Sequence, residues 1–165
     1  MIVREVHRLS EPLLDALSAL DRRLFGNAAW GRDGFVKSAA QEYDHLFVAE
    51  EEAGALSKEP GENCRFLGYA LLRVLDDAEL LQIGVDEACR RQGIGRKLMQ
   101  EVLRLSEGKN LFLEVREGNQ AARRLYAGCG FSEIGRRKRY YADPQEDAIL
   151  MELPLSAGRN CCKIC

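Results

Sequence analysis

The segment RRQGIG, residues 90–95, has the composition of an anion-binding loop. It lies between a run of strand character that ends near Val85 and an amphipathic helical pattern that follows Gly95. Backbone N–H groups in the first turn of a helix lack acceptors within the helix, and glycines let a bulky anion approach them without a Cβ in the way. The segment therefore predicts a pyrophosphate site, with an ordinary glycine-rich surface loop as the alternative.

Two other phosphate-binding loops do not match this segment. A P-loop requires GxxxxGK followed by Ser or Thr, whereas Gly95 is followed by Arg96 and Lys97 at the wrong spacing. A dinucleotide fingerprint requires a further glycine in register. The sequence therefore favours neither ATP nor NAD as the ligand.

Two further side chains, Glu114 and Tyr126, are candidates for chemistry. Glu114 lies in the apolar run LFLEV, where a carboxylate is costly to bury unless it has a partner, such as Arg116, or a function. Tyr126 shares a helical face with Leu125, and a tyrosine in that position is most often a core residue. Asn119 stands where this helix starts and is a natural N-cap. From residue types alone, a structural role and a catalytic role both remain open for Glu114 and Tyr126.

Hydrophobic periodicity predicts the elements that position these residues. The expected order is a strand at 2–6, a helix capped by Ser10 and ending near Leu24, a helix at about 33–41, strands at 45–50, 65–75 and 78–85, a helix after Gly95, a strand at 111–115, a helix after Asn119, and strands at 131–141 and 147–153. Residues 51–64 are rich in Glu, Gly and Pro and predict an exposed hairpin loop. A central βαβ unit needs a parallel crossover and the hairpins add antiparallel pairs, so the fold class is α/β, with one mixed sheet and helices on both faces.

Length and composition set further limits. A chain of 165 residues with 46% hydrophobic composition builds one domain, which we place at residues 1–155, followed by a flexible cysteine-containing tail at 156–165. The 24 basic and 26 acidic side chains nearly cancel, and no apolar run approaches the roughly 20 residues that span a bilayer. We expect a cytoplasmic protein, a monomer or weak dimer, without a nucleic-acid or membrane partner.

The histidines and cysteines do not predict a metal site. His7 and His45 have no carboxylate or cysteine at ligand spacing, so both are expected to be structural. Cys64, Cys89 and Cys129 stand apart from one another and predict reduced thiols. Cysteines 161, 162 and 165 end the chain with a CxxC spacing, but no second pair of ligands matches it.

Two motifs together resemble a known family. RxxGxG between a strand and a helix resembles the acetyl-CoA signature of the GNAT superfamily, and LEVREGNQAARRLYAGCGF resembles the corresponding segment of RimI-type ribosomal-protein-alanine N-acetyltransferases. RRKRYYADPQEDAILMEL resembles the end of that family, so the likeness extends from about Ile2 to Leu155. It implies a GNAT fold in which two parallel strands splay apart around the thioester of acetyl-CoA.

The resemblance also implies a set of site residues. The strand that contacts the pantetheine arm carries Gly84 where the family more often has alanine, and Gln82 where it more often has asparagine. A glycine within a strand makes sense where a ligand or another backbone approaches closely, or where the strand bulges. The implied cofactor-binding residues are Ile83, Gly84, Val85, Arg90, Arg91, Gln92, Gly93, Ile94, Gly95, Arg96, Asn119, Ala122 and Tyr126.

By the same resemblance, Glu114 is the general base and Tyr126 the general acid. A protein α-amine titrates at about pH 8 and must lose a proton before it attacks a carbonyl, which a carboxylate can accept directly or through water. Trp30, Tyr140 and Tyr141 are expected to shape the acceptor pocket. The implied acceptor is the α-amine of a protein N-terminus, an alanine, in a ribosomal protein. A small amine, a lysine side chain, or a non-catalytic acyl-CoA-binding module are the alternatives.

Overall fold

A computed structural model of the chain describes residues 1–51 and 65–155. The elements are β1 (Ile2–Val6), α1 (Glu11–Phe25), α2 (Gly31–Ala39), β2 (Asp44–Glu51), β3 (Arg65–Val74), β4 (Ala78–Val85), α3 (Ile94–Leu105), β5 (Leu111–Arg116), α4 (Gln120–Gly128), β6 (Ser132–Ala142) and β7 (Gln145–Leu153). The predicted order of strands and helices is confirmed. The predicted hairpin loop, the tail and Cys64 lie outside the described residues.

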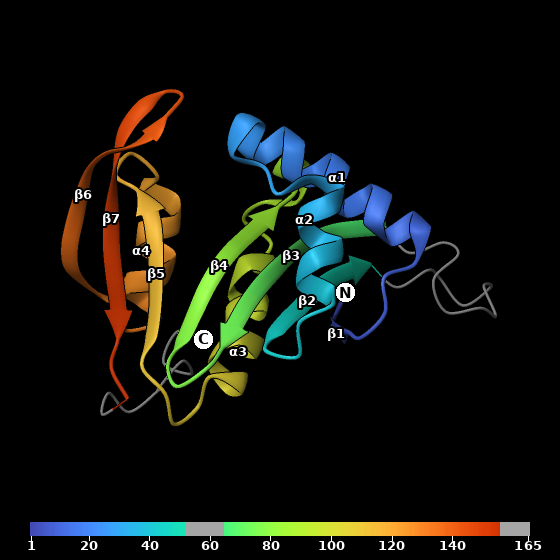
Figure 1. Cartoon of the computed structure of the whole chain (residues 1–165), viewed down its shortest axis with the longest axis horizontal. Coiled ribbons are helices and arrows are strands. Elements are labelled where there is room, and N and C mark those ends of the chain that lie inside the picture. Colours follow the sequence, from blue (N-terminus) through green and yellow to red (C-terminus); the bar gives the residue numbers. More distant parts are fainter. Residues whose placement is uncertain (52–64, 156–165) are drawn as a thin grey trace.

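The strands form one mixed sheet in the order β1-β2-β3-β4-β5-β7-β6. Neighbours pair antiparallel except β4 and β5, which run parallel and are connected through α3. Figure 1 shows α1 and α2 on one face of the sheet and α3 and α4 on the other. The predicted α/β class, with helices on both faces, is therefore confirmed.

Alternating side chains of the strands build a core on each face of the sheet. The main core joins α3 and α4 to the sheet through residues such as Leu98, Met99 and Leu113. The second core lies under α1 and α2 and includes Leu17 and Tyr69. Helices α1 and α2 cover β2 to β4, whereas β5 pairs with β7 of the β6–β7 hairpin within the sheet.

The start of α2 depends on a contact that local sequence does not reveal. The helix begins at Gly31, two residues before the predicted Asp33, because the buried carboxylate of Asp21 in α1 accepts the N–H of Gly31 at 2.9 Å. Ser10 occupies the N-cap of α1 as predicted, but its side chain makes no cap hydrogen bond. A carboxylate from a neighbouring helix thus does for α2 what a local N-cap side chain usually does.

We expect Tyr69→Phe to lower the free energy of unfolding by about 1–3 kcal/mol, because it leaves one oxygen of Asp21 buried without its donor. The Tyr69 hydroxyl donates to Asp21 at 2.9 Å, and both side chains are fully buried. Burial, and then the charge of Asp21, raise the pKa of Tyr69. An unfolded tyrosine ionises at about pH 10, so this stability is present below that pH and is lost as pH rises further.

Denaturant melts at pH 7 to 11 test this expectation. Tyr69→Phe should be less stable than the wild type at pH 7, and its stability should fall less steeply above pH 10. Equal stability of the two proteins at pH 7 would contradict the role given to the hydroxyl.

Candidate active site

The parallel pair β4–β5 separates partway along its length. Only Ala78–Leu80 pair with Leu111–Leu113, although β4 continues to Val85 and β5 to Arg116. A bulge begins where the pairing ends, because Leu71 and Leu72 of β3 pair with Gln82 and Leu80 and leave Leu81 as an extra residue. A bulge bends the strand that carries it, and Figure 1 shows β4 and β5 diverging toward their carboxyl ends. The predicted splayed pair is confirmed, and the bulge is its physical cause.

Gly84 lies on the separated part of β4, and neighbouring side chains explain its lack of a Cβ. A Cβ there would stand 2.8 Å from Leu24 and 3.0 Å from the ring of Tyr69. Leu24 belongs to α1 and Tyr69 to β3, so the close approach comes from the second core. Sequence analysis gave three possible reasons for a glycine in this strand: a close ligand, a close backbone or a bulge. The bulge lies at Leu81 and not at Gly84.

The segment RRQGIG forms the entry to α3, as predicted. Gly93 is the N-cap residue with φ 79°, a left-handed conformation that glycine adopts without strain. The N–H of Lys97 donates to the carbonyl of Gly93 at 3.0 Å, so the donors of the turn before it have no carbonyl one turn earlier in the helix. The first turn of α3 contains no acidic residue, whereas Arg96 and Lys97 are exposed there. This helix end has the donors and the charge for a diphosphate.

Ile94 and the arginines play different parts in this entry. The Ile94 side chain is buried in the main core and anchors the first turn, so only its backbone faces a ligand. Arg90 pairs with the exposed Glu87 at 3.1 Å. A solvated pair of this kind contributes little to stability, so Arg90 can exchange Glu87 for a phosphate at small cost. Arg91 and Gln92 are exposed beside it.

Asp86 fixes the chain between β4 and this entry. Its side chain accepts the N–H of Ala88 at 3.0 Å, which caps the 3-10 turn Glu87–Cys89. It also accepts from Arg23 of α1 at 2.8 Å, and its own N–H donates to Leu67 at 2.9 Å. Contacts from two elements therefore position the glycine-rich segment relative to the end of β4.

Glu114 lies on β5 beyond the last pair with β4. Its neighbours Leu113 and Val115 point into the main core, so Glu114 points to the opposite face, where α1 and α2 lie over β2 to β4. Its side chain is 22% exposed and pairs with Nε of Arg137 on β6 at 3.1 Å. The arginine partner is therefore Arg137 and not the nearby Arg116.

The hairpin β6–β7 places two tyrosines beside Glu114. The Tyr140 hydroxyl donates to Glu114, which raises the pKa of Tyr140. Burial, and then the charge of Glu114, raise the pKa of Tyr141. Arg116 holds the hairpin: it lies 4.1 Å from the centre of the Tyr141 ring and donates to the carbonyl of Asp143 at 3.0 Å. The predicted acceptor-site tyrosines and Glu114 are thus brought together.

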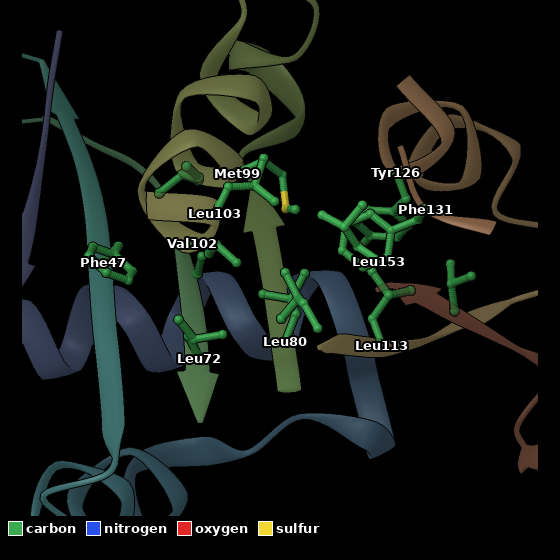
Figure 2. Close-up of a cluster of buried hydrophobic side chains, with 14 of the residues drawn as sticks. Phe47, Leu72, Leu80, Met99, Val102, Leu103, Leu113, Tyr126, Phe131 and Leu153 are labelled. Carbon is green, nitrogen blue, oxygen red and sulfur yellow. The ribbon is translucent and has the colours of Figure 1, made fainter. Parts of the chain in front are cut away.

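Tyr126 enters the site from α4 on the other face of β5. Its side chain is 5% exposed and packs with Phe131 at 5.9 Å between ring centres, as Figure 2 shows beside Leu153. Burial raises the pKa of Tyr126, and the neighbouring Tyr141 raises it further. The charge of Glu114 also raises the pKa of Tyr141, so Tyr141 interacts electrostatically with both residues predicted to be catalytic.

The start of α4 and the predicted Trp30 have structural surroundings of their own. The Asn119 side chain accepts the N–H of Ala122 at 3.1 Å, so it caps α4. Trp30 packs against the second core at the start of α2. Asn27, in the short 3-10 helix Gly26–Ala28 after α1, donates to Asp143 in the β6–β7 turn at 3.1 Å. That bond joins the two segments that border the open end of β4 and β5.

The model of the acetyltransferase (GNAT) family matches residues 14–131. The chain belongs to this family. A ribosomal protein bS18-alanine N-acetyltransferase of Escherichia coli (strain K12) is 38% identical over 119 residues, which cover 68% of this chain and 80% of that protein. N-alpha-acetyltransferase RimI of Mycobacterium tuberculosis is 35% identical over 138 residues, 80% of each chain.

The fold agrees with a solved member of the GNAT family. The crystal structure of the ribosomal-protein-S18-alanine N-acetyltransferase from Escherichia coli has a TM-score of 0.72 and 32% identity, covering 96% of this chain and 98% of that chain. The predicted membership and the predicted GNAT fold are both confirmed. The chain is a RimI-like, acetyl-CoA-dependent N-acetyltransferase.

Other candidate sites in this GNAT enzyme carry less chemistry. A cavity of about 250 Å³ between α2 and the β1–β2 pair is lined by none of the residues predicted to bind acetyl-CoA or to catalyse the reaction. At that end His45 contacts Glu5 at 2.7 Å, a carboxylate partner that sequence spacing did not reveal.

Within residues 1–51 and 65–155, no group of three or more His, Cys, Asp or Glu side chains could hold a metal ion. No helix in those ranges has both the length and the apolar character of a membrane span.

Two residues of the site were not predicted from the sequence. Arg137 was not among the predicted site residues, yet it pairs with Glu114. Gln82 was noted only as a departure from the family, yet its side chain is 9% exposed at the point where β4 and β5 separate. Alternation along each strand was a usable signal for both, but which face of the strand meets Glu114 depends on the bulge and on the β6 register.

Proposed function

We propose that this enzyme transfers acetyl from acetyl-CoA to the α-amine of a protein N-terminus, with alanine as the first residue and a ribosomal protein as the acceptor. One observation carries the proposal: Glu114 borders the gap in the parallel pair, on the face away from α3 and α4. The named relatives support the acceptor class, because one is a ribosomal protein bS18-alanine N-acetyltransferase and another an N-alpha-acetyltransferase.

The entry of α3 and the separated strand β4 supply the proposed acetyl-CoA site. The donors at Gly93, Ile94 and Gly95 would hold the diphosphate, with charge from the side chains nearby. The separated edge of β4 at residues 83–85 would hydrogen-bond the pantetheine arm, since the pairing with β5 ends at Leu80. The remaining proposed contacts come from Arg90, Arg91, Gln92, Arg96, Asn119, Ala122 and Tyr126.

The proposed chemistry uses one group on each side of β5. Glu114 accepts a proton from the acceptor ammonium, so that the neutral amine can attack the thioester carbonyl. A backbone N–H near Val85 stabilises the negative charge that develops on the carbonyl oxygen. Tyr126 then gives its proton to the departing thiolate as the C–S bond breaks, the nitrogen of the adduct loses its second proton to water, and the phenolate regains a proton from solvent. The raised pKa of Tyr126 keeps the phenol protonated at neutral pH, and a poorly solvated thiolate is itself more basic than in water.

The β6–β7 hairpin supports a peptide as the acceptor. Tyr140 and Tyr141 stand beside Glu114, and the bond from Asn27 to Asp143 links the hairpin to the loop after α1. Trp30 follows that loop, and we include these three aromatic residues in the acceptor site. We place the catalytic domain at residues 1–155.

A thiol-release assay with acetyl-CoA tests the proposed acceptor. We expect turnover with a peptide that starts with alanine and contains one internal lysine, and none with the same peptide after its α-amine is blocked. Mass spectrometry of the product should find the acetyl group on the α-nitrogen. Acetylation confined to the lysine, or to a small amine such as ethanolamine, would contradict the proposal and leave the acetyltransferase activity in place.

A further inference from the structure

Gln82 has an unusual oxygen for a side chain in a packed sheet. The residue is more than nine-tenths buried, and its Oε1 has no hydrogen-bond partner. Among the described residues it is the one buried side-chain nitrogen or oxygen in that state. A buried acceptor without a donor lowers the stability of the folded protein, and no donor among the described residues offsets this loss at Oε1.

The sheet register places this oxygen on the same face as Glu114. Gln82 pairs directly with Leu71, a member of the second core, and residues directly opposite each other share a face. Gly84, two residues later, points toward Leu24 and Tyr69 on that face. Glu114 on β5 points the same way.

Both residues also lie just beyond the last β4–β5 pair. Leu80 pairs with Leu113, Leu81 is the bulge, and Gln82 and Glu114 follow on their two strands. Their side chains therefore border the opening from opposite strands. On β4, Ile83 and Val85 point the other way, into the main core beside α3.

We propose that Gln82 is a positioning residue whose Oε1 accepts a hydrogen bond from the nitrogen of the acceptor amine. This inference rests on the proposed function. A donor that reaches Oε1 has to come from the face of Glu114, opposite to the face on which α3 begins, so the acceptor and not the diphosphate end of acetyl-CoA supplies it.

Two acceptors on two strands suit the geometry of a primary amine. An ammonium carries three N–H bonds: Glu114 removes one proton, Oε1 of Gln82 holds one of the two that remain, and the lone pair is left to attack the thioester. A hydroxyl nucleophile would have to give its single hydrogen to Glu114 and would leave Oε1 unpaired. Gln82 thereby favours nitrogen over oxygen acceptors, because a site that pairs a substrate N–H rejects analogues without one.

The variant Gln82→Leu separates this role from a structural one. It removes an unpaired buried oxygen, so the free enzyme should melt about 2–4 °C higher than the wild type. The KM for the alanine-starting peptide should rise on the order of 10- to 100-fold, while the Kd of acetyl-CoA by calorimetry stays unchanged. Gln82→Asn keeps the carboxamide and should give an intermediate peptide KM. Gln100→Leu, the same change at an exposed position of α3, should alter neither quantity.

Each other outcome overturns the inference. A lower melting temperature with an unchanged peptide KM would make Gln82 a structural residue. A raised acetyl-CoA Kd with an unchanged peptide KM would assign the amide to the pantetheine arm. If the wild type acetylates only a small amine, the proposed protein acceptor fails, but the KM of that amine in Gln82→Leu still decides the role of Gln82.

Discussion

Replacing Glu114 with glutamine is expected to lower kcat/KM for an alanine-starting peptide by about 10²- to 10⁴-fold at pH 7, the range that general-base catalysis contributes. The amide keeps the size of the carboxylate and can still accept from Tyr140, but it cannot take a proton from the acceptor. The pair with Arg137 is partly solvated, so its loss should change the melting temperature little. Steady-state kinetics and a melting curve measure both effects.

The pH dependence of this variant distinguishes a base from a binding group. As pH rises above about 8, a growing share of the acceptor is already the neutral amine, so the deficit of Glu114→Gln should shrink between pH 7 and 9.5. The matched control is Glu101→Gln, which removes a carboxylate paired with Arg104 at 2.9 Å on α3 and should keep wild-type rates. A deficit that is constant across this pH range would argue that Glu114 binds the acceptor without deprotonating it.

The fold was predictable because local pattern and tertiary structure agree over most of the chain. The amphipathic face of α3, with Leu98, Met99 and Val102, has to be buried, and the main core places it against the sheet. Where a boundary depends on a distant contact the local pattern fails, as at Gly31, whose N–H is bound by Asp21. The predicted outline therefore holds, and its errors fall at a helix end set by tertiary contact.

The site was only partly predictable, for reasons of register. Motif spacing placed Gly93 at the tip of α3 and Glu114 on a strand, because both depend on local chain order. The bulge at Leu81 shifts the face of each later residue of β4, and strand periodicity in the sequence does not show where a bulge falls. The positions of Gln82 and of Arg137 relative to Glu114 follow from such shifts in strand register, which the amino-acid sequence does not reveal.

Replacing Tyr126 with phenylalanine is expected to lower kcat by about 10²- to 10⁴-fold, because the variant lacks the proton that the departing thiolate requires. The ring contact with Phe131 remains, so the fold and the acetyl-CoA Kd should be preserved. Binding without turnover then separates proton donation from packing. Tyr69→Phe is the matched control, since that hydroxyl supports Asp21 in the second core and should lower stability while sparing kcat.

The leaving group gives a further test of Tyr126 as the acid. An acetyl thioester of a more acidic thiol departs without needing a proton, so the gap between wild type and Tyr126→Phe should narrow with such a substrate. The raised pKa of Tyr126 predicts that wild-type kcat shows no alkaline loss from this phenol at or below pH 9. A gap that stays the same with both thioesters would assign the Tyr126 hydroxyl to substrate positioning, because an acid that protonates the sulfur must respond to its basicity.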